Sequence, residues 1–270
     1  MAAIETTHIK PVVIITGSSR GIGYHLAQAF LEHGCSVTIS GHNPERLSKA
    51  YDQLKNQFGE ERLFSQIADV GDFNQVQTLW DQTMRRFQRV DIWINNAGET
   101  APPDPMWQQD PATIASIYRT NLLGLTYGCL VAVQGMRRQG FGAIYNLEGA
   151  GSDGRSHPGL TLYGTTKYAV RFLTDSIAKE LQDTSIIIAA IRPGMVITDL
   201  ILAPYQNRPQ EWERFKKVIN IIAEHPQVIA PRLAEKILQN KCSRVRIKPY
   251  TSFQILLRTI KRMMRHESLV

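Results

Sequence analysis

The sequence predicts one α/β domain, built on a doubly wound, mostly parallel sheet of about seven strands flanked by helices. Two observations support this fold class. Between residues 12 and 200, short apolar runs of strand length alternate with longer amphipathic stretches of helical periodicity. Such a β-α-β-α alternation produces parallel strands, because each crossover helix returns the chain to the same end of the sheet. The 270 residues suffice for one large domain or two small ones, and we expect a single domain over 1–270, since the alternation continues from residue 12 to about residue 200.

The predicted strands are short runs of β-branched or apolar residues, bounded by turn residues. They are 12–15, 36–40, 63–68, 90–94, 143–147, 185–191 and 244–248. Predicted helices include 46–58, 73–87, 113–136 and 233–238. The alternation lapses over 199–231, where prolines interrupt two helical pieces. A long insertion after the carboxyl end of a strand predicts a substrate lid.

The net charge of +7 is concentrated at the C-terminal end of the chain. Residues 241–270 contain eight Lys or Arg and one Glu, so that the first 240 residues are neutral overall. Within 250–266 the cations interleave with apolar residues, as in a basic amphipathic helix at a membrane interface. A subunit-interface helix and a solvated charged face are the alternatives. Nucleic acid is not an expected partner, because no recognition motif accompanies the charge.

Cysteine usage and the N-terminus bear on the compartment. Cys35, Cys129 and Cys242 are far apart and form neither a metal-binding spacing nor a disulfide framework, which favours a reducing compartment. Met1–Lys10 lacks the apolar run of a signal peptide. No stretch approaches the roughly 20 apolar residues that a membrane-spanning helix needs.

A glycine-rich turn, Thr16–Gly23, follows the first predicted strand and precedes a helical pattern. Its glycines, Gly17, Gly21 and Gly23, allow the backbone to turn tightly and approach a pyrophosphate, which the helix N-terminus attracts. The same residues match the G-x-S-x-G elbow of hydrolases. That elbow follows several strands and needs a later acid and histidine, whereas this turn follows the first strand. We therefore favour a dinucleotide site.

The end of the second predicted strand bears on which dinucleotide binds. An NAD site places an acidic residue there for the ribose hydroxyls. This chain has Ser40-Gly41-His42-Asn43, which contains no acid. Arg20 and His42 are instead candidates to face a 2′-phosphate, which favours NADP(H) over NAD(H). The alternative is that both side chains are simply exposed to solvent.

Tyr163 and Lys167 lie four residues apart in a helical pattern, so they project from the same helix face. An ammonium beside a phenol lowers the phenol's pKa, which suits proton exchange with a carbonyl or alcohol oxygen. Asn121 lies within an otherwise apolar predicted helix. A buried Asn needs partners, so it is either a satisfied core group or the holder of a water beside Lys167.

Together these residues resemble the short-chain dehydrogenase/reductase family over about residues 11–200, and the resemblance implies a Rossmann fold. The matching motifs occur in family order and at family-like spacing. They are Thr16–Gly23, Asp69-Val70, Asn95-Asn96-Ala97-Gly98, Asn121, Tyr163-x-x-x-Lys167 and Pro193-Gly194-x-Val196-x-Thr198.

The resemblance also implies roles for these residues. Tyr163 protonates the carbonyl oxygen during reduction, Lys167 binds the nicotinamide ribose and depresses the pKa of Tyr163, and Asn121 holds a water that passes protons to Lys167. With His42 added from the strand-end argument, the expected cofactor contacts are Gly17, Ser18, Ser19, Arg20, Gly21, Ile22, Gly23, His42, Asp69, Val70, Asn96, Ala97, Gly98, Tyr163, Lys167, Pro193, Gly194, Val196 and Thr198.

One position departs from the family pattern. The family usually has a serine about 13 residues before the tyrosine, and here that position is Ala150, between Gly149 and Gly151. Either Ser152, the nearest hydroxyl, takes the role of holding the substrate carbonyl, or a backbone N–H does. We favour Ser152.

The same loop resembles the chlorophyll(ide) b reductases. The similar segments are Asn146–Gly154, Tyr163–Lys167, Pro193–Leu200, Asn220–Pro226, Ala230–Arg232 and Phe253–Arg265. The resemblance implies NADPH-dependent reduction of the 7-formyl group of chlorophyll b or chlorophyllide b to a hydroxymethyl group. One alternative is that the protein reduces another lipophilic ketone or aldehyde. The other is that it is a catalytically inactive nucleotide-binding scaffold.

The family resemblance extends to assembly and location. It implies a homo-oligomer that pairs through the helices carrying Asn121 and Tyr163. We expect the protein in the cytoplasm, or in the plastid stroma for a processed plant form. A lipophilic substrate would make contact between 250–266 and a membrane surface useful.

Overall fold

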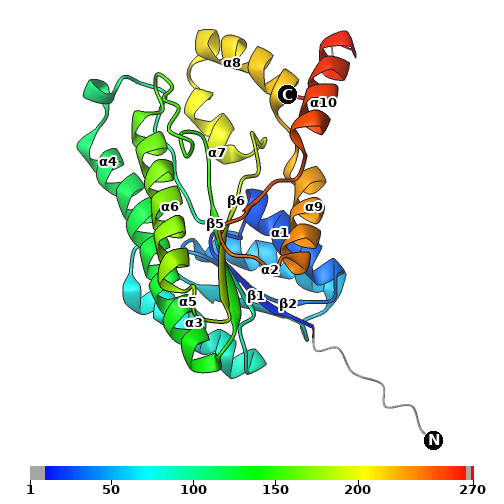
Figure 1. Ribbon diagram of the computed structural model, residues 1–270. Coiled ribbons are helices and arrows are strands. Elements are labelled where there is room, and N and C mark those ends of the chain that lie inside the picture. The colour runs from blue at the N-terminus through cyan, green and yellow to red at the C-terminus, as the bar shows by residue number, and fades with distance from the viewer. Residues whose placement is uncertain (1–9, 266–268) are drawn as a thin grey trace, which may run out of the picture.

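A computed structural model of the chain describes residues 10–265, 269 and 270, so Met1–Ile9 of the N-terminal stretch discussed above lie outside the described residues. One sheet has the strand order β3-β2-β1-β4-β5-β6-β7, and every pair is parallel. Its strands are β1 (Val12–Ile15), β2 (Ser36–Gly41), β3 (Leu63–Ile67), β4 (Ile92–Asn95), β5 (Gly142–Leu147), β6 (Ile186–Ile191) and β7 (Arg246–Ile247). The predicted seven-stranded, doubly wound sheet is confirmed (Figure 1).

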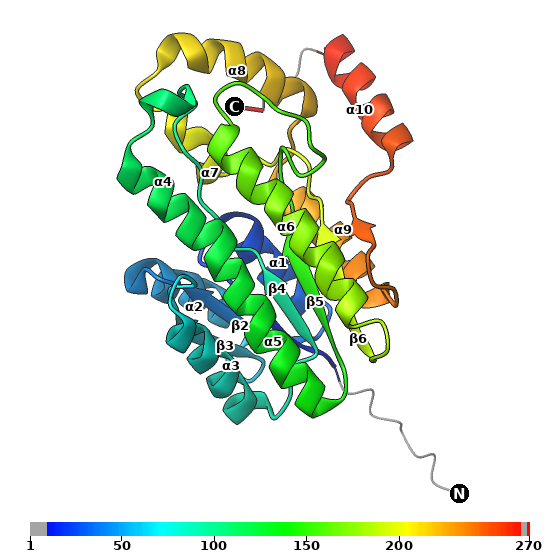
Figure 2. The ribbon, with the colours of Figure 1, turned by 60° about the vertical axis from the view of Figure 1, so that its left-hand side comes forward.

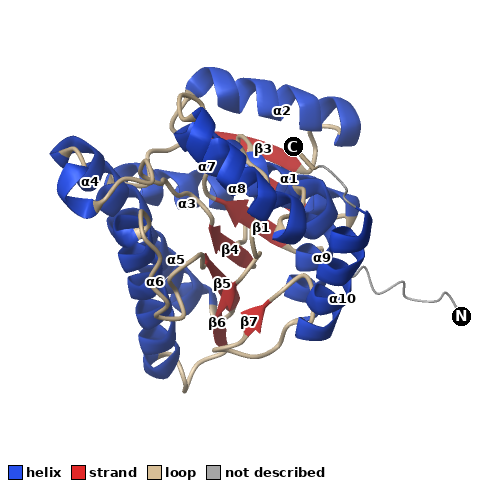
Figure 3. Cartoon of the chain, turned by 90° about the horizontal axis from the view of Figure 1, so that it is seen from above, coloured by secondary structure: helices blue, strands red, loops and turns tan. Residues whose placement is uncertain are grey.

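Helices cover both faces of the sheet (Figures 2 and 3). They are α1 (Gly21–Glu32), α2 (Pro44–Phe58), α3 (Phe73–Phe87), α4 (Pro111–Tyr118), α5 (Leu125–Gln139), α6 (Thr161–Glu180), α7 (Asp199–Leu202), α8 (Pro209–Ile222), α9 (Pro226–Gln239) and α10 (Ser252–Arg265). Side chains of α1, α2 and α9 form one core with the sheet, and those of α3, α5 and α6 form the other.

The strands are continuously apolar because both of their faces are buried. Along β1, Val13 and Ile15 point into the α1–α2–α9 core, and Ile14 points into the α3–α5–α6 core. Local signals also set the helix starts. Asn43 and Asp72 cap α2 and α3 by accepting bonds from backbone N–H groups of the first turn. Pro44 at the first position of α2 supplies a backbone already set for a helix.

Three predicted boundaries differ from the structure. The long helix 113–136 is α4 and α5, joined by a π-helical segment over Arg119–Gly124. The predicted lid, 199–231, extends too far, because α9 begins at Pro226 and packs its Pro226 and Ile229 into the core. The prolines of 226 and 231 therefore mark one core helix, with Pro231 inside it. The seventh strand, predicted over 244–248, is Arg246–Ile247, and the preceding Arg244 and Val245 also make backbone hydrogen bonds to β6.

The predicted C-terminal amphipathic helix is present as α10, which packs beside α8 (Figure 2). Its orientation was not predicted. Arg258 and Arg262 turn inward and pair with Glu224, which lies between α8 and α9. The apolar residues of α10 that are about half exposed or more are Phe253, Ile255, Leu256, Leu257, Ile260 and Met264, and all of them except Ile255 lie on the helix face opposite Arg258 and Arg262. Within the described ranges, no helix combines the length and apolarity needed to cross a membrane.

Candidate active site

The glycine-rich turn lies where the strand order reverses, with β1 between β2 and β4. Ligands of doubly wound sheets bind in the crevice at the carboxyl ends of such strands. Gly17 has φ of 61°, and a Cβ placed on it would lie 2.7 Å from the Cα of Ala97. A Cβ on Gly23 would lie 2.5 Å from Nδ2 of Asn96. The turn and the end of β4 are therefore packed so closely that only glycine fits at both positions.

Polar bonds hold this turn in place. Nδ2 of Asn96 donates to the carbonyl oxygens of Thr16 at 2.8 Å and Gly17 at 2.9 Å. The hydroxyl of Ser18 donates to the carbonyl of Ile15 at 2.7 Å and accepts from the backbone N–H of Ser40 at 2.9 Å. No side chain in the described part of the chain caps the N-terminus of α1, so the first-turn N–H groups remain available to an anion.

Other predicted cofactor residues surround this crevice. Thr198 lies beside the turn, 3.4 Å from a Cβ placed on Gly21, and Val196 is buried with its backbone paired to Glu224. Asp69, after β3, forms an ion pair with Arg119 at 2.8 Å. His42, after β2, is exposed. Arg20 pairs with Asp199 at 2.7 Å, and both side chains are more than half exposed.

The tyrosine–lysine pair lies in the first half of α6. Lys167 is 3% exposed, and its Nζ donates to the carbonyl oxygen of Leu147 at 2.9 Å. The same Nζ lies 5.5 Å from the ring centre of Tyr163. A Cβ placed on Gly98 would lie 3.4 Å from Oδ1 of Asn121 and 3.9 Å from Nζ of Lys167. The ends of β4 and β5 therefore meet the pair predicted to carry the chemistry.

The pKa shifts of this pair correct one expectation. Burial raises the pKa of the Tyr163 hydroxyl to about 12 and lowers the pKa of the Lys167 ammonium to about 8. The expected lowering of the tyrosine's pKa by the lysine is therefore wrong for this structure. The loss of hydration disfavours the charged form of each group, and it is the dominant cause of both shifts. Tyr163 is a neutral phenol at neutral pH, which is the form that donates a proton.

Asn121 lies in the π-helical segment between α4 and α5, and such segments are frequent at functional sites. Its Oδ1 accepts from the backbone N–H of Glu99 at 2.7 Å, and its Nδ2 donates to the carbonyl of Glu99 at 2.9 Å. Nδ2 also donates to the hydroxyl of Thr166 at 3.1 Å, one residue before Lys167. The amide therefore ties the end of β4 to α6, as a satisfied core group does.

The structure gives no support to the role expected of Ser152. Its hydroxyl is buried, donates to Oε2 of Glu148 at 3.1 Å and accepts from Arg192 at 2.9 Å. The residue that meets the Tyr163 hydroxyl is Gly149, where an added Cβ would overlap that oxygen. Ser152 is engaged in a network of charged side chains because the loop turns it toward β6.

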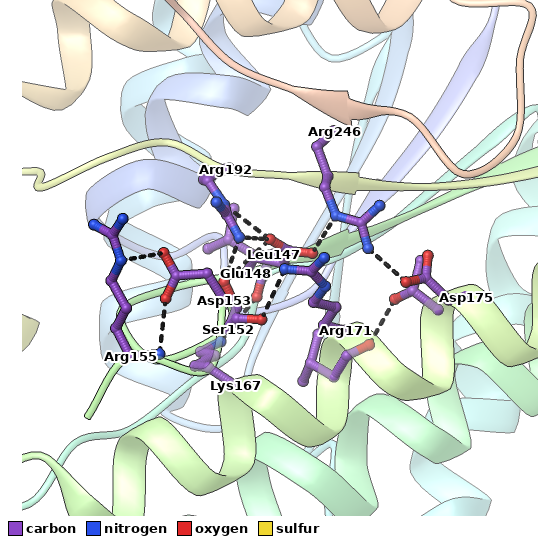
Figure 4. A network of polar contacts seen from close by, with 12 residues as sticks. Leu147, Glu148, Ser152, Asp153, Arg155, Lys167, Arg171, Asp175, Arg192 and Arg246 are labelled. Atoms are coloured by element: carbon purple, nitrogen blue, oxygen red, sulfur yellow. Dashed lines mark hydrogen bonds and ion pairs between the residues drawn. The ribbon is translucent and has the colours of Figure 1, made fainter. Parts of the chain in front are cut away.

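That network is the part of the site that the sequence analysis missed (Figure 4). Glu148, directly after β5, pairs with Arg192 after β6 and with Arg246 in β7. Arg246 also pairs with Asp175 of α6 at 2.6 Å. The sequence did contain a signal for this network, because Glu148, Arg192 and Arg246 each lie in or directly after one of three strands. It becomes readable only when the order β5-β6-β7 is known.

The fold, the glycine turn and the tyrosine–lysine pair are those of a Rossmann-type dehydrogenase. Residues 11–208 match the short chain dehydrogenase family model, and the chain belongs to this family. Over 230 residues the chain is 38% identical to the chloroplastic chlorophyll(ide) b reductase NOL of Oryza sativa subsp. japonica, covering 83% of this chain and 66% of NOL. It is 30% identical over 269 residues to the probable chlorophyll(ide) b reductase NYC1 of Arabidopsis thaliana, covering 94% of this chain and 53% of NYC1. The chain thus spans between about half and two thirds of these relatives.

The structure of ElxO with NADP bound superposes with a TM-score of 0.75 at 25% identity, covering 88% of this chain and 96% of that one. This solved relative holds a nicotinamide cofactor in the same fold.

Proposed function

We propose that the protein reduces a formyl or keto group of a bulky apolar substrate with NADPH. The substrate we propose is chlorophyll b or chlorophyllide b, whose 7-formyl group becomes a hydroxymethyl group. The observation that carries the proposal is the half-buried Tyr163, a neutral phenol beside Lys167, at the same edge of the parallel sheet as the glycine turn. The similarity to NOL and NYC1 supports the choice of substrate.

The residues of the glycine turn fit such a cofactor, because no side chain of the described residues caps the N-terminus of α1 there and the close contact of Gly17 and Gly23 with the end of β4 fixes the backbone of the turn. The N–H groups at the first turn of α1 would hold the diphosphate, and Asp69 and Val70 would hold the adenine. Asn96–Gly98 would border the ribose, and Pro193–Thr198 the nicotinamide. A reduced nicotinamide bound there supplies the hydride.

In this proposal Tyr163 supplies the proton. As the carbonyl carbon becomes a CH–OH centre, the proton on the Tyr163 hydroxyl moves to the substrate oxygen and leaves a phenolate. The ammonium of Lys167, which is protonated below pH about 8, stabilises that phenolate. With Ser152 engaged elsewhere, a backbone N–H of the 149–151 turn is the second donor we assign to the substrate oxygen.

We also assign NADP(H) in preference to NAD(H), because no acid follows β2 and the exposed His42 lies there. The ion pair of Arg20 with Asp199 lies at the surface, where such a pair contributes about 0–1 kcal/mol, so Arg20 can turn toward a phosphate at little cost. The substitution His42→Asp is expected to raise KM for NADPH about tenfold and to leave KM for NADH unchanged or lower. If the ratio of KM for NADPH to KM for NADH is unchanged in His42→Asp, His42 does not contact the 2′-phosphate.

The outward apolar face of α10 supports contact with a membrane surface. A charged residue at exposed Leu257, in Leu257→Glu, is expected to abolish sedimentation with anionic lipid vesicles. The substitution Lys261→Gln, on the same helix, serves as the control for charge. Equal sedimentation of wild type and Leu257→Glu rules out this face.

Exposed apolar residues on α5 and α6, namely Leu130, Tyr168 and Phe172, support the proposed homo-oligomer. Phe172 is 71% exposed in the isolated chain. The substitution Phe172→Glu is expected to convert the oligomer to a monomer in light scattering, and an unchanged mass places the interface elsewhere.

The experiment that tests the function is turnover of chlorophyllide b with NADPH, followed by formation of the 7-hydroxymethyl product. The substitution Tyr163→Phe is expected to lower kcat about a thousandfold and to leave NADPH binding nearly intact. Persistent turnover in Tyr163→Phe rejects the proton donor. Absence of turnover by wild type, with NADPH still bound, favours another lipophilic ketone or aldehyde. Inactivity toward a broad carbonyl panel favours the inactive scaffold.

A further inference from the structure

Glu148 is a fully buried acid next to the proposed reacting groups. Its side chain is 0% exposed, and one oxygen, Oε2, lies 2.9 Å from Arg192. The other oxygen, Oε1, accepts from Arg246 at 3.2 Å. The hydroxyl of Ser152 adds a third bond, at 3.1 Å. A carboxylate so buried remains charged only where such partners replace its water.

The partners come from separate elements, and so the network joins them (Figure 4). Arg192 follows β6, and Arg246 is in β7. Arg246 continues to Asp175, and Arg171 donates to the carbonyl of Ser152 at 3.3 Å. Asp175 and Arg171 belong to α6, the helix that carries Tyr163 and Lys167. The ends of three neighbouring strands are thereby fastened to the helix of the proposed proton donor.

The residues on either side of Glu148 contact that donor pair directly. The carbonyl of Leu147, one residue before, accepts the bond from Lys167. Gly149, one residue after, lies against the hydroxyl of Tyr163. The Glu148 side chain anchors the backbone between these two contacts. It therefore determines where Leu147 meets Lys167 and where Gly149 meets Tyr163.

We propose that Glu148 is a positioning residue for the proton transfer: its clamped carboxylate holds the Leu147–Gly149 backbone against Lys167 and Tyr163. This inference rests on the proposed function for the reaction that it serves. Its charge has a second consequence, because Glu148 opposes the effect of burial on the pKa of Lys167. The elements packed around Lys167 carry titratable groups that include Tyr118 in α4, Arg119 in the π-helical segment, Glu99 after β4, Glu148 after β5, Arg192 after β6, Arg246 in β7, and Tyr163, Tyr168, Arg171, Asp175, Lys179 and Glu180 in α6.

The substitution Glu148→Gln tests this role, because it keeps the shape of the side chain and removes its charge. The titration of Lys167 is followed by NMR in lysine-labelled protein, with Lys167→Met identifying the resonance. We expect the midpoint of Lys167 to fall by about one pH unit in Glu148→Gln. The matched control is Asp175→Asn at the far end of the network, in which the midpoint stays in place.

Activity gives the second readout. With whichever carbonyl substrate turns over, the alkaline limb of the pH–kcat profile is expected to move to lower pH in Glu148→Gln, by the same amount as the titration. A midpoint and a limb that stay unchanged, with kcat lowered equally at every pH, overturn the inference. The NMR titration needs no substrate, so failure of the chlorophyllide b assay leaves it unaffected.

A Glu148→Gln chain that does not fold is replaced by Glu148→Gln with Arg246→Gln, which removes one charge of each sign. The reference is Arg246→Gln alone, from which the double variant differs only by the Glu148 charge: a lower Lys167 midpoint in the double variant than in Arg246→Gln supports the inference, and equal midpoints overturn it.

Discussion

Two glutamates of this protein are each clamped by two arginines, and the two clamps differ in what their arginines can do. Glu148 is held by Arg192 and Arg246, which lie at the ends of β6 and β7 within the sheet. Glu224 is held by Arg258 and Arg262, which both lie on the peripheral helix α10. The side chain of Glu148 is 0% exposed, and that of Glu224 is 12% exposed.

The difference shows that the loss of stability on removing the central glutamate depends on whether its two arginines can then become hydrated. The arginines of α10 regain hydration if the helix moves away, which is a local opening. The side chains of Arg192 and Arg246 are 26% and 22% exposed, but their backbone lies at the paired edge of β6 and β7 and cannot move away as a peripheral helix can. The Glu148 clamp is therefore a part of the core, and the Glu224 clamp is a docking contact.

The largest expected effect separates the two clamps by stability. The substitution Glu148→Ala should lower the free energy of unfolding by about 3 kcal/mol, because it strands two arginines beside a buried site. The substitution Glu224→Ala should lower it by about 1 kcal/mol. Urea unfolding of both variants measures the difference. Equal losses would show that the arginines of the two clamps are equally confined.

Next in size is the effect of the backbone that the Glu148 clamp positions. The substitution Gly149→Ala should lower kcat about a hundredfold with no loss of folding, because the new methyl group displaces the Tyr163 hydroxyl. Gly164→Ala in α6 is the control, since its Cβ meets nothing closer than 3.7 Å. Steady-state kinetics at saturating NADPH give the comparison. Full activity of Gly149→Ala would show that the loop at Gly149 does not position the Tyr163 hydroxyl.

A smaller effect follows from pH. Because burial lowers the pKa of Lys167 to about 8, its positive charge is present below that pH and is lost above it. We expect kcat for reduction to be about fivefold lower at pH 9 than at pH 8. Glu224→Gln should leave this decline in place, unlike Glu148→Gln. A rate that stays level to pH 10 would exclude Lys167 as the group that titrates.

The smallest expected effect concerns the Glu224 clamp. Replacing both Arg258 and Arg262 by Ala should speed hydrogen exchange throughout α10 and change kcat for a small water-soluble aldehyde less than twofold. Lys261→Ala is the control, because that side chain is exposed. Unchanged exchange would mean that packing against α8, rather than the arginines, holds α10 in place.

The strands β1 to β6 were predictable because burial on both faces imposes apolar runs of strand length. The motif residues of the crevice were predictable because a tight approach of backbone to backbone requires glycine at Gly17 and Gly23. The end of the segment expected to be a lid could not be predicted, since a proline such as Pro226 starts a core helix as readily as it interrupts a loop.

The Glu148 clamp could not be predicted from spacing, because Arg192 and Arg246 follow Glu148 by 44 and 98 residues. Nor could the pKa of Tyr163, since the sign of its shift depends on how deeply the pair is buried. The orientation of α10 could not be predicted from the sequence for a similar reason. An amphipathic pattern defines two faces, and Glu224 decides which of them turns inward.

The short strand β7 also has a consequence for solubility. The neighbouring strand β6 consists of isoleucine and alanine alone. Its outer edge is paired by β7 at Ala190 and Ile191, and by the preceding Arg244 and Val245 through hydrogen bonds to Ile188 and Ala190. An apolar strand with an open edge is a template for pairing with another chain. By fastening Arg246 to Glu148 and Asp175, the protein keeps that edge covered, so weakening these ion pairs should promote aggregation between chains as well as impair the site.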